Sequence, residues 1–343
     1  MPEAAPTEVR PEWFTCVPAR DDLGLLHRLF RHAWLTELTN LIEVCEANLA
    51  LDLADLRAKV RALRAAPRLS PAVFFIVHRL RRGIAAGDVT EVFDALFFLR
   101  RAPREELTAR PGMEVTSILT EAWEYGFVEE MRAYRPVLAG GEPVYPYDTL
   151  VRPILSHPLE GHRAAIAEAH AQIRAADPVV AAEHDEFVTH TKLFDGVVLR
   201  GMTATHAFGA IFLRIPPRDD DAVTYWIEHL VHEISHLKLE LLAQHGRLVL
   251  NPPEERYPPP IRKDPRPMAG IVHATFVLAR MVRVFRALVA LGHGPAHAAR
   301  LDALTAQFEQ GLGTLRAHAR WTEHGRGIAD TLEPCARGLA VPA

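Results

Sequence analysis

The sequence contains few features that would place it in a specialised class of protein. Its three cysteines, Cys16, Cys45 and Cys335, lie far apart and form no C-x-x-C pair. That usage fits a reducing, cytoplasmic compartment better than a disulfide-stabilised secreted protein. The first residues lack a charged segment followed by an apolar run, so no signal peptide is expected. No uncharged apolar run approaches the length of about 18 residues that a membrane span needs, so no membrane association is expected.

The chain also lacks a marked excess of either charge. Its 343 residues include 39 Lys and Arg against 43 Asp and Glu, which gives a formal net charge of −4. Proteins that bind nucleic acid are usually basic, so nucleic acid is not expected as a partner. Hydrophobic residues at 49% and charged residues at 24% describe an ordinary globular chain that is long enough to bury a core.

Apolar residues recur at three- and four-residue steps over much of the chain, which predicts a mainly α, multi-helix fold. The proline-rich residues 1–20 are expected to be a flexible N-terminus. Residues 21–135 predict a helical region of about five elements, including a helix over 113–132, that is a candidate for peptide recognition. A connector rich in proline and glycine covers 136–153. Residues 154–325 are expected to form the catalytic, metal-binding region.

Two segments of this second region predict β-structure. Residues 194–200 and 208–215 are rich in β-branched and aromatic side chains, and a loop separates them. We expect a small β-hairpin that packs near a long helix over 222–244, with Asp219 to Asp221 as its N-terminal cap. Two more long helices are predicted over residues 267–291 and 295–323, followed by an irregular tail.

The helix over 222–244 carries the most specific motif in the chain, His232-Glu233-Ile234-Ser235-His236. In this H-E-x-x-H pattern the two imidazoles lie one helical turn apart on the same face, where both can bind one metal ion. An apolar stripe on the same helix predicts that the site is half buried. Glu240, one turn after His236, is expected to be a solvated surface residue.

A catalytic metal needs a third protein ligand, and the sequence offers alternatives. The metzincin pattern fails because leucines occupy the positions of its Gly and third His. Glu255 lies 19 positions after His236, a spacing familiar from gluzincin peptidases, but it sits in a proline-rich loop over 251–267. That loop is expected to fold back over the metal-binding helix. His273, on the next predicted helix, is the favoured third ligand, because a buried imidazole needs partners.

The segment from the predicted hairpin through H-E-x-x-H, Asp264-Pro265-Arg266-Pro267 and Gly270-Ile271-Val272-His273 resembles the HExxH proteins of peptide-modifying gene clusters. Those proteins are similar to α-ketoglutarate-dependent, non-haem iron hydroxylases of ribosomally made peptides. The resemblance covers about residues 190–290. It implies Fe(II) as the metal, α-ketoglutarate and O₂ as co-substrates, and β-hydroxylation of a peptide side chain.

Under this interpretation His232, His236 and His273 hold the iron, and an arginine holds the distal carboxylate of α-ketoglutarate. Two arginines compete for that role. Arg266 is the residue of the family motif. Arg280 follows His273 by seven positions, which places it on the same helix face and about 10.5 Å along the axis.

Glu233 separates the alternative functions. In a hydroxylase it orients an imidazole or contacts substrate. In a zinc metallopeptidase of gluzincin type, with His232, His236 and Glu255 as ligands, it is the general base that activates metal-bound water. The third alternative is a non-catalytic helical module that binds a peptide. In each case a peptide is the expected partner, in some cases with a leader segment, and the sequence does not indicate an oligomeric state.

Overall fold

The computed structural model describes residues 10–17, 22–110, 112–133, 151–197, 199–217, 221–261 and 264–339. Most of the predicted connector over 136–153, and Asp219 and Asp220, lie outside the described residues. Of the segment predicted to be a flexible N-terminus, residues 10–17 are packed against the rest of the chain, because Trp13 and Cys16 are buried.

The prediction of a mainly α, multi-helix fold is confirmed. The α-helices are α1 (Leu23–Leu49), α2 (Ala54–Leu63), α3 (Pro71–Ala86), α4 (Val89–Arg101), α5 (Arg104–Leu107), α6 (Glu124–Ala133), α7 (Ser156–Ala176), α8 (Pro178–Phe187), α9 (Ala222–Ala243), α10 (Met268–Ala290), α11 (Pro295–His318) and α12 (Glu323–Ala336). The strands are β1 (Glu114–Ser117), β2 (Val151–Pro153), β3 (His190–Gly196), β4 (Gly201–Met202) and β5 (Ala210–Arg214), and 3-10 turns cover Pro11–Trp13 (η1) and Thr205–Ala207 (η3).

The strands form one mixed sheet in the order β1-β3-β5-β4, with β2 pairing to β3. The prediction of a hairpin between residues 194–200 and 208–215 was wrong, because β3 and β5 run parallel. After β3 the chain passes to the far side of β5, forms β4 and returns through η3. The hairpin is therefore between β4 and β5, which pair antiparallel. This topology makes β4 the edge strand beside the loop that carries Thr203 and Thr205.

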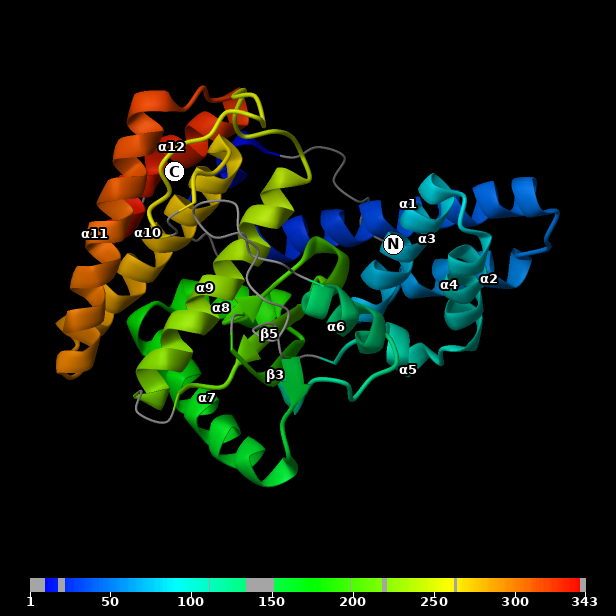
Figure 1. Cartoon of the computed structure of the whole chain (residues 1–343), viewed down its shortest axis with the longest axis horizontal. Coiled ribbons are helices and arrows are strands. Elements are labelled where there is room, and N and C mark those ends of the chain that lie inside the picture. The colour runs from blue at the N-terminus through cyan, green and yellow to red at the C-terminus, as the bar shows by residue number, and fades with distance from the viewer. Residues whose placement is uncertain are drawn as a thin grey trace.

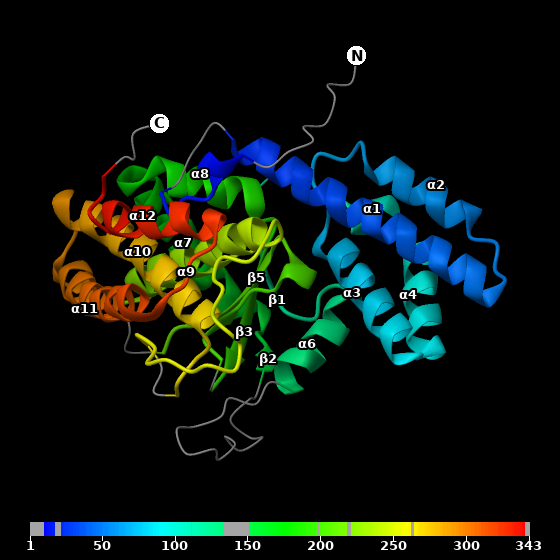
Figure 2. The same cartoon turned by 90° about the horizontal axis from the view of Figure 1, so that it is seen from above.

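The sheet lies in the middle of the molecule, between two groups of helices (Figure 2). Helices α1 to α5 lie on one side in Figure 1, and α10, α11 and α12 lie on the other. Phe212 of β5 stacks on Phe127 of α6 at 4.5 Å between ring centroids. Leu213, the next residue of β5, points to the opposite face of the sheet, because side chains alternate along a strand. That opposite face is the one on which α9 packs.

Local sequence signals locate most helix ends correctly. Ser70 caps α3 by accepting a hydrogen bond from the Ala72 amide at 3.3 Å. Asp221 caps α9, whose bounds agree with the predicted helix over 222–244, by accepting from the Val223 amide at 3.1 Å. The helix predicted over 113–132 was wrong in its first part, because residues 114–117 pair with β3 as strand β1.

The tail after residue 323 was also predicted wrongly, since it forms α12. Two glycines of this helix allow close approach of another segment. A Cβ at Gly325 would lie 1.9 Å from the Leu248 carbonyl oxygen, and one at Gly327 would lie 2.5 Å from that of Phe14. Helix α12 packs on α10 and so belongs to the same packed region as α9 and α10.

Helix α10 is the central helix of the second helical group. By length and composition alone it could cross a membrane, but 72% of its most apolar window is buried inside the fold. It packs against α9, α11 and α12. Its apolar character is therefore that of a core helix, and the fold is compatible with a soluble protein.

One fully buried cation joins several of these elements. Arg280 of α10 donates from Nε to Ser235 Oγ of α9 at 3.0 Å and from Nη1 to the Cys16 carbonyl at 3.1 Å. Its Nη2 forms an ion pair with Glu183 of α8, whose side chain is also fully buried. A buried charge is tolerated only when it is paired and hydrogen-bonded, and every nitrogen of this guanidinium has an acceptor.

We predict that Arg280→Met destabilises the protein by about 3–5 kcal/mol, because it removes the close partner of the buried Glu183 carboxylate and leaves the more distant Lys238 Nζ, at 3.8 Å, as its cationic neighbour. Urea denaturation followed by circular dichroism measures this change. Arg316→Met is the matched control: Arg316 pairs with Glu333 on the surface, with 64% of its side chain exposed, and should change stability by about 1 kcal/mol or less. Equal effects of the two substitutions would contradict the prediction.

Candidate metal centre

The H-E-x-x-H motif lies in the middle of α9, where the helix is almost completely enclosed. Leu230, Ile234, Leu237 and Leu241 are buried as the predicted apolar stripe requires. The helix packs against α7 and α10 and against the edge of the sheet. These contacts hold the motif rigid, which is the condition under which two imidazoles can share one ion.

The imidazoles of His232 and His236 point at one another. Their Nε2 atoms are 3.0 Å apart, and their ring centroids are 4.7 Å apart. Metal–nitrogen bonds of about 2.0–2.1 Å at angles between 90° and 110° place two ligand nitrogens roughly 2.9–3.4 Å apart. The observed separation fits that range, so the two side chains are arranged to bind one ion.

His273 of α10 reaches the same place from the neighbouring helix. Its ring centroid lies 5.3 Å from that of His236. Its Nε2 lies 3.5 Å from Oε1 of Glu240, whose Oε2 accepts a hydrogen bond from Thr205 at 2.8 Å. The predicted third histidine is therefore next to the pair. A carboxylate accompanies it, because Glu240 is turned toward His273 by the loop after β4.

The electrostatic surroundings favour neutral imidazoles, which is the form that binds metals. Burial lowers the pKa of His236 well below its usual value, and the charges of His232 and His273 add to this effect. Burial also lowers the pKa of His273, against the opposing charge of Glu240. Three imidazoles and one carboxylate form a donor set that fits a divalent transition metal such as Fe(II) or Zn(II).

Glu233 is directed toward the edge of the sheet. Only 3% of the residue is exposed, and its Oε2 accepts a hydrogen bond from Thr203 at 2.9 Å. A Cβ at Gly201 of β4 would lie 2.3 Å from Oε1, so a glycine is needed where β4 passes this carboxylate. Burial raises the pKa of Glu233 to about 8, although the Thr203 hydrogen bond opposes the shift.

Arg266 precedes α10 and forms an ion pair with Asp264 at 2.6 Å. Its backbone pairs with Tyr257 in an isolated bridge, and its side chain is 34% exposed. Among the described residues, the only atom within 4 Å of a Cβ added at Gly270, one turn before His273, is Arg266 Cβ at 3.5 Å. The surface of α10 at Gly270 is therefore open to the extent of this side-chain position.

Arg280 does not meet the prediction that it holds a co-substrate carboxylate. Its guanidinium is fully buried and is shared among Glu183, Ser235 and the Cys16 carbonyl. The helical repeat correctly predicted that Arg280 lies on α10. It contains no information on which other elements pack against that residue. Arg280 is a structural residue beneath the motif, and Arg266 is the remaining candidate of the two.

Glu255 does not lie at the site either. It accepts a hydrogen bond from Tyr257 and forms an ion pair with Arg320 at 3.3 Å. The proline-rich loop does not fold back over α9 as expected. It packs along α11, where Gln310 and Thr314 donate hydrogen bonds to the carbonyls of Pro259 and Pro258. Those carbonyls have no partners within their own loop, because consecutive prolines supply no amide donors.

Three residues of the site were missed or assigned otherwise from the sequence: Thr203, Thr205 and Glu240. Glu240 follows His236 by one turn, and that spacing was the only available signal for it. The two threonines lie in a loop whose position depends on the pairing of β4 with β5, which the sequence did not reveal. His229, one turn before Glu233, stacks on Tyr225 with ring centroids 3.9 Å apart and is a core residue.

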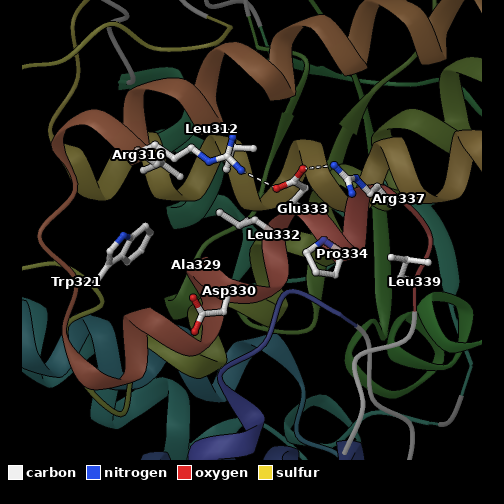
Figure 3. A pocket seen from close by; sticks show the side chains of 11 residues that line it. Leu312, Arg316, Trp321, Ala329, Asp330, Leu332, Glu333, Pro334, Arg337 and Leu339 are labelled. Carbon is white, nitrogen blue, oxygen red and sulfur yellow. Dashed lines mark hydrogen bonds and ion pairs between the residues drawn. The ribbon is translucent and has the colours of Figure 1, made fainter.

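A surface pocket of about 460 Å³ lies elsewhere, between α11 and α12. Figure 3 shows Glu333 at its rim between Arg316 and Arg337, which both bind its carboxylate, with Trp321 and Asp330 toward the other end. None of the residues predicted for the metal site lines it. It is therefore separate from the candidate metal centre.

No protein-family model matches the chain, and no curated protein sequence is significantly similar to it. The resemblance to HExxH peptide-modifying proteins consequently stays a prediction that depends on the motif residues themselves.

We predict that His273→Ala lowers the metal content of purified protein at least tenfold, because it removes a ligand beside the His232–His236 pair. Glu255→Ala should leave the metal content unchanged, since Glu255 is bound to Tyr257 and Arg320. Metal analysis after dialysis against a defined concentration of Fe(II) or Zn(II) measures both. The reverse result would assign the third ligand to Glu255.

Proposed function

We propose that the protein is an Fe(II)- and α-ketoglutarate-dependent oxygenase that hydroxylates a side-chain β-carbon of a peptide. The observation that supports this most is that His273 lies beside His236, which itself faces His232, while Glu255 lies elsewhere. Because Glu255 lies away from the two histidines of the motif, the gluzincin alternative is left without its third ligand. The positions of His232, His236 and His273 are compatible with the all-histidine triad that the sequence resemblance implies.

The side chains divide the task between them. His232, His236 and His273 bind the metal, and Glu240 orients His273 or joins it as a ligand. Arg266 binds the distal carboxylate of α-ketoglutarate across the open side-chain position at Gly270. When bound, Fe(II) with α-ketoglutarate and O₂ supplies the oxidising power that attacks an unactivated C–H bond.

The peptide substrate has a natural place along β4. This strand lies at the edge of the sheet and, among the described residues, pairs only with β5. An extended peptide binds an exposed edge by adding a strand through main-chain hydrogen bonds. Since Gly201 touches Glu233, a peptide on this edge runs past the carboxylate next to the metal ligands.

We predict that Arg266→Met raises the KM for α-ketoglutarate about tenfold or more, because a hydrogen bond to a charged group is worth roughly 1.5–3 kcal/mol. Gly270→Leu should have a similar effect by filling the open position between Arg266 and His273, without loss of metal. Succinate formation in the presence of Fe(II) and candidate peptides is the measurement. Arg256→Met, an exposed arginine of the same loop, is the matched control.

A second function is favoured by the surroundings of Glu233. A buried carboxylate beside two metal ligands, held by Thr203, is the arrangement of a general base that takes a proton from metal-bound water. With His273 as third ligand the site would then be that of a zinc hydrolase acting on peptides. In this case the substrate would lie on the same β4 edge.

Glu233→Gln distinguishes the two functions, because glutamine keeps the shape and accepts the Thr203 hydrogen bond but takes up no proton. For the oxygenase we expect succinate formation within about threefold of the unmodified protein. For the hydrolase we expect a loss of about 10²–10⁴-fold in peptide hydrolysis. Metal content should be unchanged in both cases, which shows that the substitution has not disrupted the site. A peptide that binds metal-free protein and is never altered would support the non-catalytic module.

The proposed setting is the cytoplasm. It rests on the absence of paired cysteines among the described residues, since Cys16, Cys45 and Cys335 are free and buried. The proposed partner is a peptide.

A further inference from the structure

Helices α7 and α8 bring together a second group of metal-binding side chains. It consists of His170 on α7 and the consecutive residues His184 and Asp185 on α8. One ligand atom from each lies within 4.8 Å of the other two. The two ring centroids are 4.5 Å apart and the planes are tilted by 50°, so the imidazoles are not stacked face to face. The group shares no residue with the H-E-x-x-H site.

Three of the four imidazole nitrogens of this group are buried and form no hydrogen bond with the described residues. His184 is 2% exposed, and neither Nδ1 nor Nε2 is hydrogen-bonded. His170 Nε2 is buried and lacks a hydrogen-bond partner as well. His170 Nε2 has only the Asp185 carboxylate nearby, in an ion pair at 3.3 Å. Because buried polar groups in native proteins are nearly always satisfied, the unsatisfied ring of His184 beside this pair points to a ligand that binds there.

The carboxylate is oriented to complete the group. Arg174 donates to Asp185 Oδ2 at 2.8 Å, which leaves Oδ1 turned toward His170 Nε2 at 3.3 Å. A metal-binding carboxylate is commonly fixed in this way by a hydrogen bond to its second oxygen. Burial lowers the pKa of His184 to about 3, and the charges of His170 and Arg174 add to the effect, so this imidazole is neutral at physiological pH.

A similar group elsewhere in the structure has its polar atoms paired with other protein groups, and it serves as a comparison. His78, Glu130 and His206 also bring three ligand atoms together. There, however, Glu130 accepts from His206 at 3.0 Å and from Arg82 at 3.0 Å, and the two rings are stacked at 4.2 Å. None of their nitrogens is left buried without a partner. That group is an ion-pair network and needs no ligand.

We propose that His170, His184 and Asp185 form a second metal site, which binds Zn²⁺ or another late first-row divalent ion. Two imidazoles and one carboxylate form a donor set typical of such ions, with water at the remaining position. Asp185 is 45% exposed, so the ion has a route to the site from solvent. The ion would join α7 to α8.

The role of this site is structural. Glu183, next to His184 on α8, forms the ion pair with Arg280. A metal bound at His184 therefore fixes the helix that holds this buried ion pair. The proposal does not depend on which reaction the H-E-x-x-H site performs.

The test uses full-length protein carrying His232→Ala and His236→Ala, which removes the first site and leaves the second. After treatment with a chelator, this variant is titrated with Zn²⁺ by calorimetry, and its thermal midpoint is measured with and without Zn²⁺. We expect one equivalent to bind and the midpoint to rise by a few degrees, because an ion that binds only the folded state stabilises it. Co²⁺ should give the visible absorption of a bound, low-symmetry ion.

Adding His170→Ala or Asp185→Asn to this background should weaken binding at least tenfold and abolish the shift in midpoint. Asp185→Asn is the milder change, because it alters one exposed group and keeps its shape. Adding His32→Ala, which removes an exposed histidine on α1, is the control and should change neither quantity. The proposal is overturned if the folded background variant binds no Zn²⁺, or if its binding survives both substitutions.

Discussion

The candidate metal centre depends on one buried guanidinium. Arg280 binds Glu183 of α8, Ser235 of α9 and the carbonyl of Cys16 from the N-terminal segment. Ser235 is one of the two variable positions of the H-E-x-x-H motif, so the cation lies directly beneath the metal ligands. Losing any one of these contacts would leave a donor of the buried guanidinium, or the Glu183 carboxylate, without its partner in an apolar interior. The arrangement therefore fixes α10 against α9, and with it His273 against His236.

The packing around Arg280 explains how histidines of two different helices converge at the candidate metal centre. His232 and His236 are positioned by the helical repeat alone. His273 is positioned only by the packing of α10, which in turn depends on buried contacts two turns further along the helix. The same contacts explain the chemical contrast between the two arginines. Arg280 is fully buried, and all its donor nitrogens are bound to groups inside the protein. Arg266 lies just before α10 and is partly exposed.

The features that were predicted correctly from the sequence are those that depend on residues close together in the chain. The limits of α9, its Asp221 cap and the shared face of His232 and His236 all follow from spacing and local hydrogen bonding. The approach of His273 was predicted from the need of a buried imidazole for partners. The role of Glu240 was not, because it depends on Thr205, whose position follows from the pairing of β4 with β5. The parallel pairing of β3 and β5 did leave a signal that was not used. Both strands are buried almost without interruption, and β5 is a continuous apolar run, as is typical of parallel strands covered on both faces.

The predicted roles of Glu255 and the tail failed for a related reason. A proline-rich segment excludes regular structure, but its course is decided by where acceptors for its carbonyls are found, and these are on α11. The tail was predicted to be irregular, but it forms α12, which contains Gly325 and Gly327. They are required because backbone carbonyls from Leu248 and Phe14 come close to that helix.

The N-terminal segment and the last helix meet in the folded protein. The Cys16 amide donates to Thr331 at 2.8 Å, and the carbonyl of Cys16 accepts from Arg280. These contacts join residues more than 260 positions apart in the chain. Pairings across such separations are costly to form early, because a long loop must close before any contact compensates for it. During synthesis, the segment around Cys16 therefore cannot form these contacts until α10 and α12 have been made.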